Sequence, residues 1–335
     1  MVRVSAFAIV TSFTLAAVTA LGACGKSAPP AGGAATTGSA APGPVIGTDR
    51  TAIELPGDAN GIVWDATSNA LYIADGASAQ IEKWSDGVGF TPIAQLPHDA
   101  AYVGSAGAGS GSMMASTGKL SLGGLARVPA GFVTTSFGFG TTGTVFVAPA
   151  AGGGAVHSVP GLDPARRRLG LAQAPDGTLY DGYVVVADGK TRGGVARLDL
   201  ATGETDLADV AGKPVGVLAT GDTLFVSDQD KNQILAIALA TPAAPPRVVA
   251  HDLPSVDLLA RLPNGDLITG GKRGVVTRVD VTTGAATPIA NHFDQVRGVA
   301  YDPVGKRLFV VEHSRATKRQ HLYIVAYDAG AKGGA

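Results

Sequence analysis

The stretch that decides the fold is NGIVWDATSNALYIADG, residues 60–76. Two short apolar runs, at 62–64 and 71–74, flank a segment of turn-forming residues, which predicts two strands joined by a tight turn. Two more strand-length runs follow at 80–84 and 90–95, with a second turn segment between them. The sequence therefore predicts a four-stranded antiparallel meander.

The same unit recurs along the chain. Successive copies align at Gly61, Gly124, Gly170, Gly216, Asp257 and Gly298, with steps of 63, 46, 46, 41 and 41 residues. A period in the forties that carries four strands is typical of β-propeller blades. We therefore expect an all-β, six-bladed β-propeller of four-stranded antiparallel blades over residues 50–328. The last copy lacks a fourth strand, and TAIEL at 51–55 has no partner in the first, so this N-terminal strand is predicted to close the ring.

The residues before the propeller are predicted to be a targeting segment followed by a flexible linker. Arg3 precedes an apolar run at 4–21, and the ending LGAC at 21–24 resembles the lipobox of bacterial lipoproteins. This resemblance implies that residues 1–23 are a cleaved signal peptide and that Cys24 is lipidated. The alternatives are an uncleaved transmembrane anchor or an ordinary secretory signal. Residues 24–49, rich in Ala, Gly and Pro, predict a flexible linker, and residues 329–335 a disordered tail.

These features predict a location in the bacterial cell envelope, with the membrane as a partner through Cys24. A net charge of −1 argues against a nucleic-acid partner. The single cysteine excludes a disulfide within the chain and paired haem attachment. The glycine pattern at 138–143 precedes a strand-like run rather than a helix, so it predicts a hairpin turn and no dinucleotide site. The Gly/Ser-rich insertion at 102–119 predicts a mobile surface loop.

One face of the predicted ring carries the connectors between blades and the loops between second and third strands. Three connectors hold His98, His251 and His292, each close to an aspartate. Histidine with a carboxylate can form a metal site or a general-base pair. The other interpretation, which we favour from sequence, is that each His–Asp pair caps a turn.

The loops between second and third strands supply further candidates on the same face. Four blades place an acidic residue there, at Asp75, Asp188, Asp228 and Glu312, and blades three to six also place Lys or Arg there. The run Arg166-Arg167-Arg168 is expected on this face as well. Such a rim attracts an anionic ligand or an acidic partner surface, or it is simply a solvated polar edge.

With the repeats aligned, PGDANGIVWDATSNALYIADGASAQIEKW at 56–84 resembles an NHL-type repeat and the opening blade of the regucalcin and gluconolactonase family. Both are six-bladed propellers. The lactonase family binds a divalent metal on the channel axis through Glu, Asn and Asp side chains at the entrance to the innermost strands. The places that correspond by this resemblance are Asn60, Gly123, Leu169, Val215, Val256 and Arg297. Asn60 suits a cation and Arg297 would repel one, while Asp257 is one residue from the expected place.

The leading functional expectation is therefore a non-catalytic binding or scaffold lipoprotein, with no cofactor and with an unknown small ligand or an envelope protein as its partner. Asn60 and Arg297 are expected to lie close together at an otherwise apolar channel mouth and to form its ligand site. Alternatively, Arg297 pairs with Asp294 or a carbonyl group and seals the channel. The alternative function is a metal-dependent lactonase or esterase-like hydrolase of the gluconolactonase type, with a divalent cation in a diverged metal site.

Overall fold

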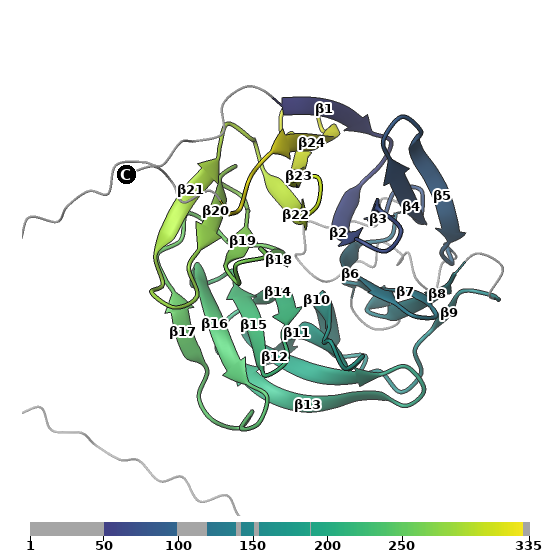
Figure 1. Ribbon diagram of the computed structural model, residues 1–335. Coiled ribbons are helices and arrows are strands. Elements are labelled where there is room, and N and C mark those ends of the chain that lie inside the picture. Colours follow the sequence, from purple (N-terminus) through teal and green to yellow (C-terminus); the bar gives the residue numbers. More distant parts are fainter. Residues whose placement is uncertain (1–49, 99–118, 139–141, 151–153, 188, 331–335) are drawn as a thin grey trace, which may run out of the picture. The chain divides into compact units, whose positions relative to one another are not determined.

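The computed structural model describes residues 50–98, 119–138, 142–150, 154–187 and 189–330. Within these ranges the regular structure is β-sheet throughout, in six four-stranded antiparallel sheets arranged as blades around an axis (Figure 1). The predicted six-bladed β-propeller is thereby confirmed. No helix in these ranges is long and apolar enough to cross a membrane. The signal peptide, Cys24, the linker, the insertion up to residue 118 and Asp188 lie outside the described residues.

Each of the first three blades is a simple meander of four consecutive strands. Blade 1 contains β2 (Ala59–Asp65), β3 (Ala70–Asp75), β4 (Gln80–Ser85) and β5 (Gly89–Gln95). Blade 2 contains β6 (Leu122–Val128), β7 (Gly131–Ser136), β8 (Val145–Pro149) and β9 (His157–Ser158). Blade 3 contains β10 (Arg166–Gln173), β11 (Leu179–Ala187), β12 (Lys190–Asp199) and β13 (Gly203–Val210).

Blades 4 and 5 follow the same order, and blade 6 differs only in its last strand. Blade 4 contains β14 (Pro214–Ala219), β15 (Thr223–Asp228), β16 (Gln233–Ala238) and β17 (Arg247–Ala250). Blade 5 contains β18 (Leu259–Arg261), β19 (Leu267–Thr269), β20 (Val276–Val279) and β21 (Ala286–Ala290). Blade 6 contains β22 (Val296–Asp302), β23 (Arg307–His313), β24 (Gln320–Ala326) and the N-terminal β1 (Arg50–Leu55).

Strand β1 closes the ring as predicted. It pairs antiparallel with β24 over six residues, from Arg50 opposite Val325 to Leu55 opposite Gln320. The Arg50 guanidinium lies 4.4 Å from the ring centre of Phe293 and also donates to the Asn291 carbonyl at 3.2 Å. The last blade is thus completed by residues from the opposite end of the domain. The ordered chain also continues past the expected end at residue 328, because Ala329 is buried and its N–H donates to the Tyr301 hydroxyl.

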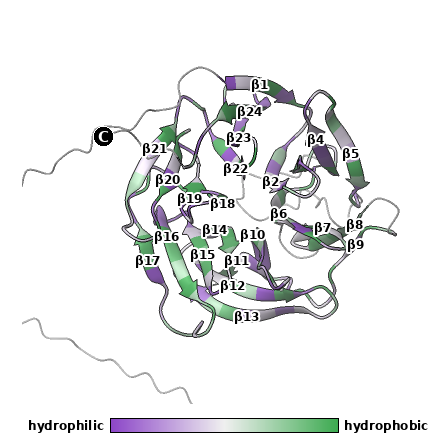
Figure 2. Ribbon diagram, viewed as in Figure 1, coloured by the Kyte–Doolittle hydropathy of each residue, from purple (hydrophilic) through white to green (hydrophobic). Residues whose placement is uncertain are grey.

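The hydrophobic core lies mainly between neighbouring blades, not inside one sheet. Apolar residues of β3 in blade 1, such as Ile73, share a buried cluster with Phe309 and Val311 of β23 in blade 6. Trp64 stacks on Phe309 across the same boundary, with ring centres 5.3 Å apart. Figure 2 shows hydrophobic residues along strands of all six blades. Because each blade buries its faces against its two neighbours, the innermost strands β2, β6, β10, β14, β18 and β22 contact one another in sequence around the axis.

Candidate functional site

A cavity of about 310 Å³ opens where the innermost strands begin. Six of its lining residues are equivalent positions of the six blades: Asn60, Gly123, Leu169, Val215, Asp257 and Arg297. The others include connector and loop residues, namely Lys213, Gln229, Lys272 and Gln295. The cavity therefore lies on the face that carries the blade connectors, where the sequence predicted a ligand site.

An irregularity in strand pairing directs these residues toward the axis. In five blades the register between the first and second strand shifts at this place, for example between Ala59 and Ile62 and between Val296 and Gly298. Such a bulge leaves a residue unpaired and re-aims its side chain. The glycine that follows is required by close packing, because a Cβ atom on Gly61 would lie 2.3 Å from the Gly123 carbonyl oxygen of the next blade.

Blade 5 departs from the register expected from the sequence. A Cβ atom on Gly216 of blade 4 would lie 2.4 Å from the carbonyl oxygen of Asp257, as one on Gly170 would lie close to the Val215 carbonyl. Asp257 is therefore the counterpart of Asn60, and Leu258 stands at the glycine position. The expectation that Val256 occupies this place is wrong by one residue, because blade 5 has no glycine to mark the register. Sequence reasoning thus noted this aspartate but placed it one residue away from the cavity wall.

The backbone of Asp257 is held at both ends. The Ser227 hydroxyl donates to its carbonyl oxygen at 2.6 Å, and its own N–H donates to the Thr269 hydroxyl at 3.2 Å. Burial raises the pKa of Asp257 to about 7, although the nearby charges of Arg297 and Lys213 favour the ionised form. A carboxyl group with this pKa can take up or release a proton near neutral pH.

Cationic side chains from four blades or their connectors share the cavity with this carboxyl group: Arg167, Lys213, Lys272 and Arg297. The three consecutive arginines that the sequence analysis expected on this face do not all point the same way, because successive side chains of a strand lie on opposite faces of the sheet. Arg166 and Arg168 lie on the other side of β10, where both contact Glu204, while Arg167 lines the cavity. Burial lowers the pKa of Lys213, and the charge of Lys272 adds to this effect. Lys213 itself was not among the sequence candidates.

The structure brings Asn60 and Arg297 to the same cavity, on the neighbouring strands β2 and β22. The Asn60 side-chain amide donates to the Leu122 carbonyl at 2.8 Å, which leaves its oxygen as the free acceptor. Arg297 does not seal the channel by pairing with Asp294, because Asp294 binds Arg315 with a 2.6 Å contact. The buried Nε atom of Arg297 has no hydrogen-bond partner within the described residues.

The acidic candidates at the ends of second strands serve another purpose. Asp75, Asp228 and Glu312 each accept a hydrogen bond from a backbone N–H of the preceding connector, those of Asp58, Lys213 and Asp294, at 2.6, 3.1 and 2.7 Å. This contact fastens the connector to the blade that follows it. None of the three lines the cavity.

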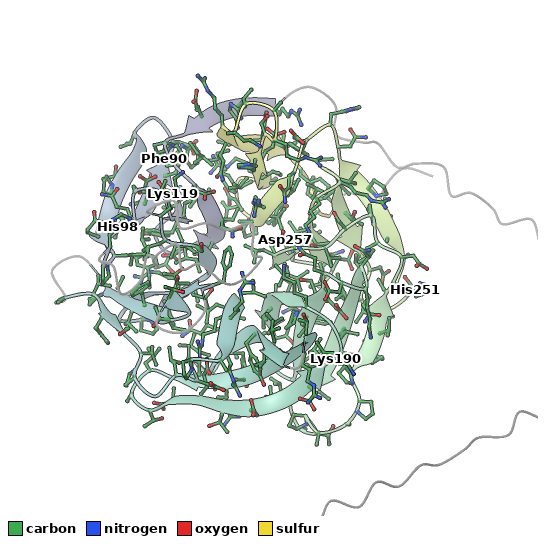
Figure 3. All side chains as sticks on the ribbon, turned by 180° about the vertical axis from the view of Figure 1, so that it is seen from behind. Phe90, His98, Lys119, Lys190, His251 and Asp257 are labelled. Atoms are coloured by element: carbon green, nitrogen blue, oxygen red, sulfur yellow. The ribbon has the colours of Figure 1, made fainter. Side chains whose placement is uncertain are left out.

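The histidine candidates lie apart from one another and from the cavity. Figure 3 shows His98 and His251 on opposite sides of the periphery, with Asp257 near the centre of the ring. His251 contacts Asp252 at 2.6 Å, but both side chains are largely exposed, at 74% and 92%. His292 is exposed and has a φ of 63°, and Asp252 has a φ of 54°, both typical of turns. The His251–Asp252 contact joins two side chains, so capping of the turn backbone by these pairs stays a prediction.

The cavity does not fit a hard divalent metal ion. Such an ion needs several oxygen ligands, and the axial positions offer only the Asn60 amide oxygen and the Asp257 carboxylate. Four cationic side chains surround the same space. No group of three or more His, Cys, Asp or Glu side chains within the described ranges is arranged to hold a metal.

No protein-family model and no curated protein matches the sequence. Solved structures do share the fold. The chain is similar to a luciferin-regenerating enzyme, with a TM-score of 0.61, 14% identity and coverage of 85% of this chain and 98% of that one. It is also similar to a gluconolactonase from Xanthomonas campestris, with a TM-score of 0.60, 16% identity and coverage of 86% and 96%. A third similar structure is regucalcin from Agrobacterium tumefaciens, a calcium-binding protein. Its TM-score is 0.57 and its identity 15%, with coverage of 81% of this chain and 92% of that one.

At this level of identity the likeness shows the fold, and it confirms the resemblance to regucalcin and gluconolactonase-type propellers. It also corrects the leading functional expectation. The expectation of a non-catalytic binding or scaffold protein is wrong as the leading one, because several solved structures that resemble the chain over most of its length are gluconolactonases or related enzymes, which favours the alternative. The sequence argument had ranked catalysis second because most metal ligands are missing, and it had placed Asp257 one residue away from the axial position.

Proposed function

We propose that the protein is a hydrolase of ester or lactone bonds and that the axial cavity is its active site. The observation that carries this proposal is the presence of Asp257, with a pKa raised to about 7, on the same cavity wall as Arg297. The likeness to gluconolactonase-type structures supports the reaction class. The proposed reaction uses no metal ion, because the side chains that line the cavity do not fit one.

In the proposed mechanism Asp257 is the general base. Its carboxylate removes a proton from a water molecule, and the water oxygen forms a bond to the carbonyl carbon while the carbonyl π electrons move onto oxygen. The guanidinium of Arg297 stabilises the resulting oxyanion by charge and hydrogen bonding. The tetrahedral intermediate then expels the alcohol oxygen, which takes the proton held by Asp257. The products are a carboxylic acid and an alcohol, and Asp257 returns to its initial state.

The first prediction concerns this base. Asp257→Asn should lower kcat/KM for the best substrate in a screen of lactones and esters by about 10²- to 10⁴-fold, the usual contribution of a general base. The melting temperature and circular dichroism spectrum should show an intact fold. Treatment with EDTA should leave the wild-type rate unchanged. Equal rates in the two proteins, or a rate that EDTA abolishes and a divalent ion restores, would overturn this mechanism.

We also propose that the enzyme is anchored in the bacterial cell envelope through a lipid on Cys24. The support is the lipobox-like LGAC at 21–24, followed by a linker of small residues. Two or more lipid chains are needed for stable anchoring, and a lipoprotein cysteine supplies them. In a bacterial host, the wild-type protein should incorporate labelled palmitate and sediment with membranes, whereas Cys24→Ala should do neither. Sedimentation and labelling that persist in the variant would refute the anchor.

A further inference from the structure

The charge of the axial cavity differs from that of the rest of the molecule. The chain carries a net charge of −1, yet four cationic side chains line the cavity against one carboxyl group. Elsewhere in the ring, several arginines are paired with a carboxylate: Arg278 with Asp266, Arg307 with Asp302 and Arg315 with Asp294. Within the described residues, Lys213, Lys272 and Arg297 form no such ion pair. The cavity lining therefore carries a local surplus of positive charge.

The cations of the cavity repel one another. Lys213 is partly buried, and the charges of Lys272 and Arg167 oppose its ionisation. Like charges held together in a partly desolvated site repel each other, and a bound anion relieves that repulsion. An arrangement that is costly when empty and favourable when filled indicates a binding site more than a structural contact.

The polar neighbours of these cations hold them in position. Gln229 accepts a hydrogen bond from the Lys213 ammonium at 2.9 Å and donates one to the Val256 carbonyl at 3.3 Å. The guanidinium of Arg167 lies 5.8 Å from the ring centre of Phe137, which also lines the cavity. Lys213 is thus oriented by the chain itself and keeps two further N–H donors for a ligand.

We infer that the cavity binds its ligand through an oxyanion, a carboxylate or a phosphate group, held by Arg167, Lys213 and Lys272 on the side of blades 3 to 5. This inference rests on the proposed function, so the ligand is the substrate: an ester or lactone that bears a separate anionic group. Binding of that group directs the carbonyl carbon toward Asp257 and Arg297. The cavity volume of about 310 Å³ suits a small molecule of this kind.

Binding of simple anions tests the site without any assay of catalysis. The full chain is titrated with inorganic phosphate and with citrate by calorimetry at low ionic strength. Lys213→Met and Arg167→Gln should each weaken binding by about 10-fold or more, the effect of losing one charge-assisted hydrogen bond. Lys190→Met, an exposed lysine of β12 outside the cavity, is the matched control and should bind as the wild type does. Absence of binding, or equal weakening in the control, would overturn the inference.

A second arm separates the substrate class from the reaction itself. Two lactones that differ only in an anionic group, such as gluconolactone and its 6-phosphate or its uronic-acid analogue, are compared as substrates. The anionic lactone should show a kcat/KM at least about 10-fold higher, and Lys213→Met should remove this preference. Equal values for both lactones would refute the substrate class and leave the hydrolase intact. Anion binding at the cavity without turnover of any lactone would support the anion site and refute the hydrolase.

Discussion

Asp257 and Asp181 are both buried aspartates, and they illustrate what a raised pKa does and does not indicate. Burial raises the pKa of each, but Asp181 is fully buried inside blade 3 beside Arg168 and Glu204 and does not line the axial cavity. Asp257 lines the axial cavity, where a substrate can reach its carboxyl group. The perturbed pKa becomes an argument for catalysis only when it is combined with access and with neighbouring groups that can stabilise charge.

The raised pKa of Asp257 predicts a pH dependence. The group titrates at 3.8 in an ordinary environment and at about 7 in the folded protein. When the pKa of a group is higher in the folded than in the unfolded protein, the group contributes to the free energy of unfolding. This contribution is fully present at a pH below the unfolded-state pKa, and it is lost as the pH rises to the folded-state pKa. The wild type should therefore lose stability relative to Asp257→Asn between about pH 4 and pH 7, by at most on the order of 4 kcal/mol.

Chemical denaturation of both proteins across this range checks the prediction. Over the same window kcat/KM should rise, because the general base must be ionised. The charges that face Asp257 are those of Arg297, Lys213 and Lys272. A stability difference between the two proteins that does not change from pH 4 to pH 7 would contradict the assignment.

At the scale of the element, the first strand of each blade shows what sequence could and could not predict. The alternation of apolar runs and turn residues specified the strands of blade 1 to within a few residues, from β2 to β5. The bulge at the start of the first strand has no such signature, because it depends on the backbone of the next blade. The glycine that accompanies it served as the register mark, and its replacement by Leu258 shifted the predicted site by one residue.

The site also depends on contacts that periodicity does not encode. Residues 166–168 are all arginines, so residue type alone does not distinguish them. Only the alternation of side chains in the folded strand places Arg167 in the cavity and the other two beside Glu204. Lys213 reaches the cavity from a connector, where no repeat pattern applies. A search for polar residues two positions before each axial residue would have found it.

The closing strand β1 supports a prediction of its own. Deletion of residues 50–55 should lower the melting temperature by about 10 °C or more, because it exposes the edge of β24 and removes the buried Leu55 side chain. Thr51→Ala, an exposed change on the same strand, should leave the melting temperature nearly unchanged. Differential scanning calorimetry distinguishes these outcomes, and a deletion variant as stable as the wild type would show that the ring closes without β1.

At the scale of the whole molecule, the ring converts local features of separate blades into one site. Residues that lie as far apart in sequence as Asn60 and Arg297 meet because blades 6 and 1 are neighbours in the closed ring. Their shared cavity followed from the repeat count and the closure, both of which the sequence predicted. The positive charge of the cavity could not be predicted in this way, because it arises from strands and loops of four blades that converge only in three dimensions.

The six axial positions have a consequence for the handedness of the substrate. The backbone repeats around the axis, but the side chains do not: Asp257, Arg297 and Asn60 occupy three successive blades, and Gly123, Leu169 and Val215 occupy the next three. Around the channel axis, the carboxyl, guanidinium and amide groups therefore follow one another in a single rotational direction. A molecule held at three such points cannot be replaced by its mirror image without losing at least one of the contacts. Under the proposed function, the cavity should therefore distinguish the two enantiomers of one lactone, although its backbone frame is nearly symmetric.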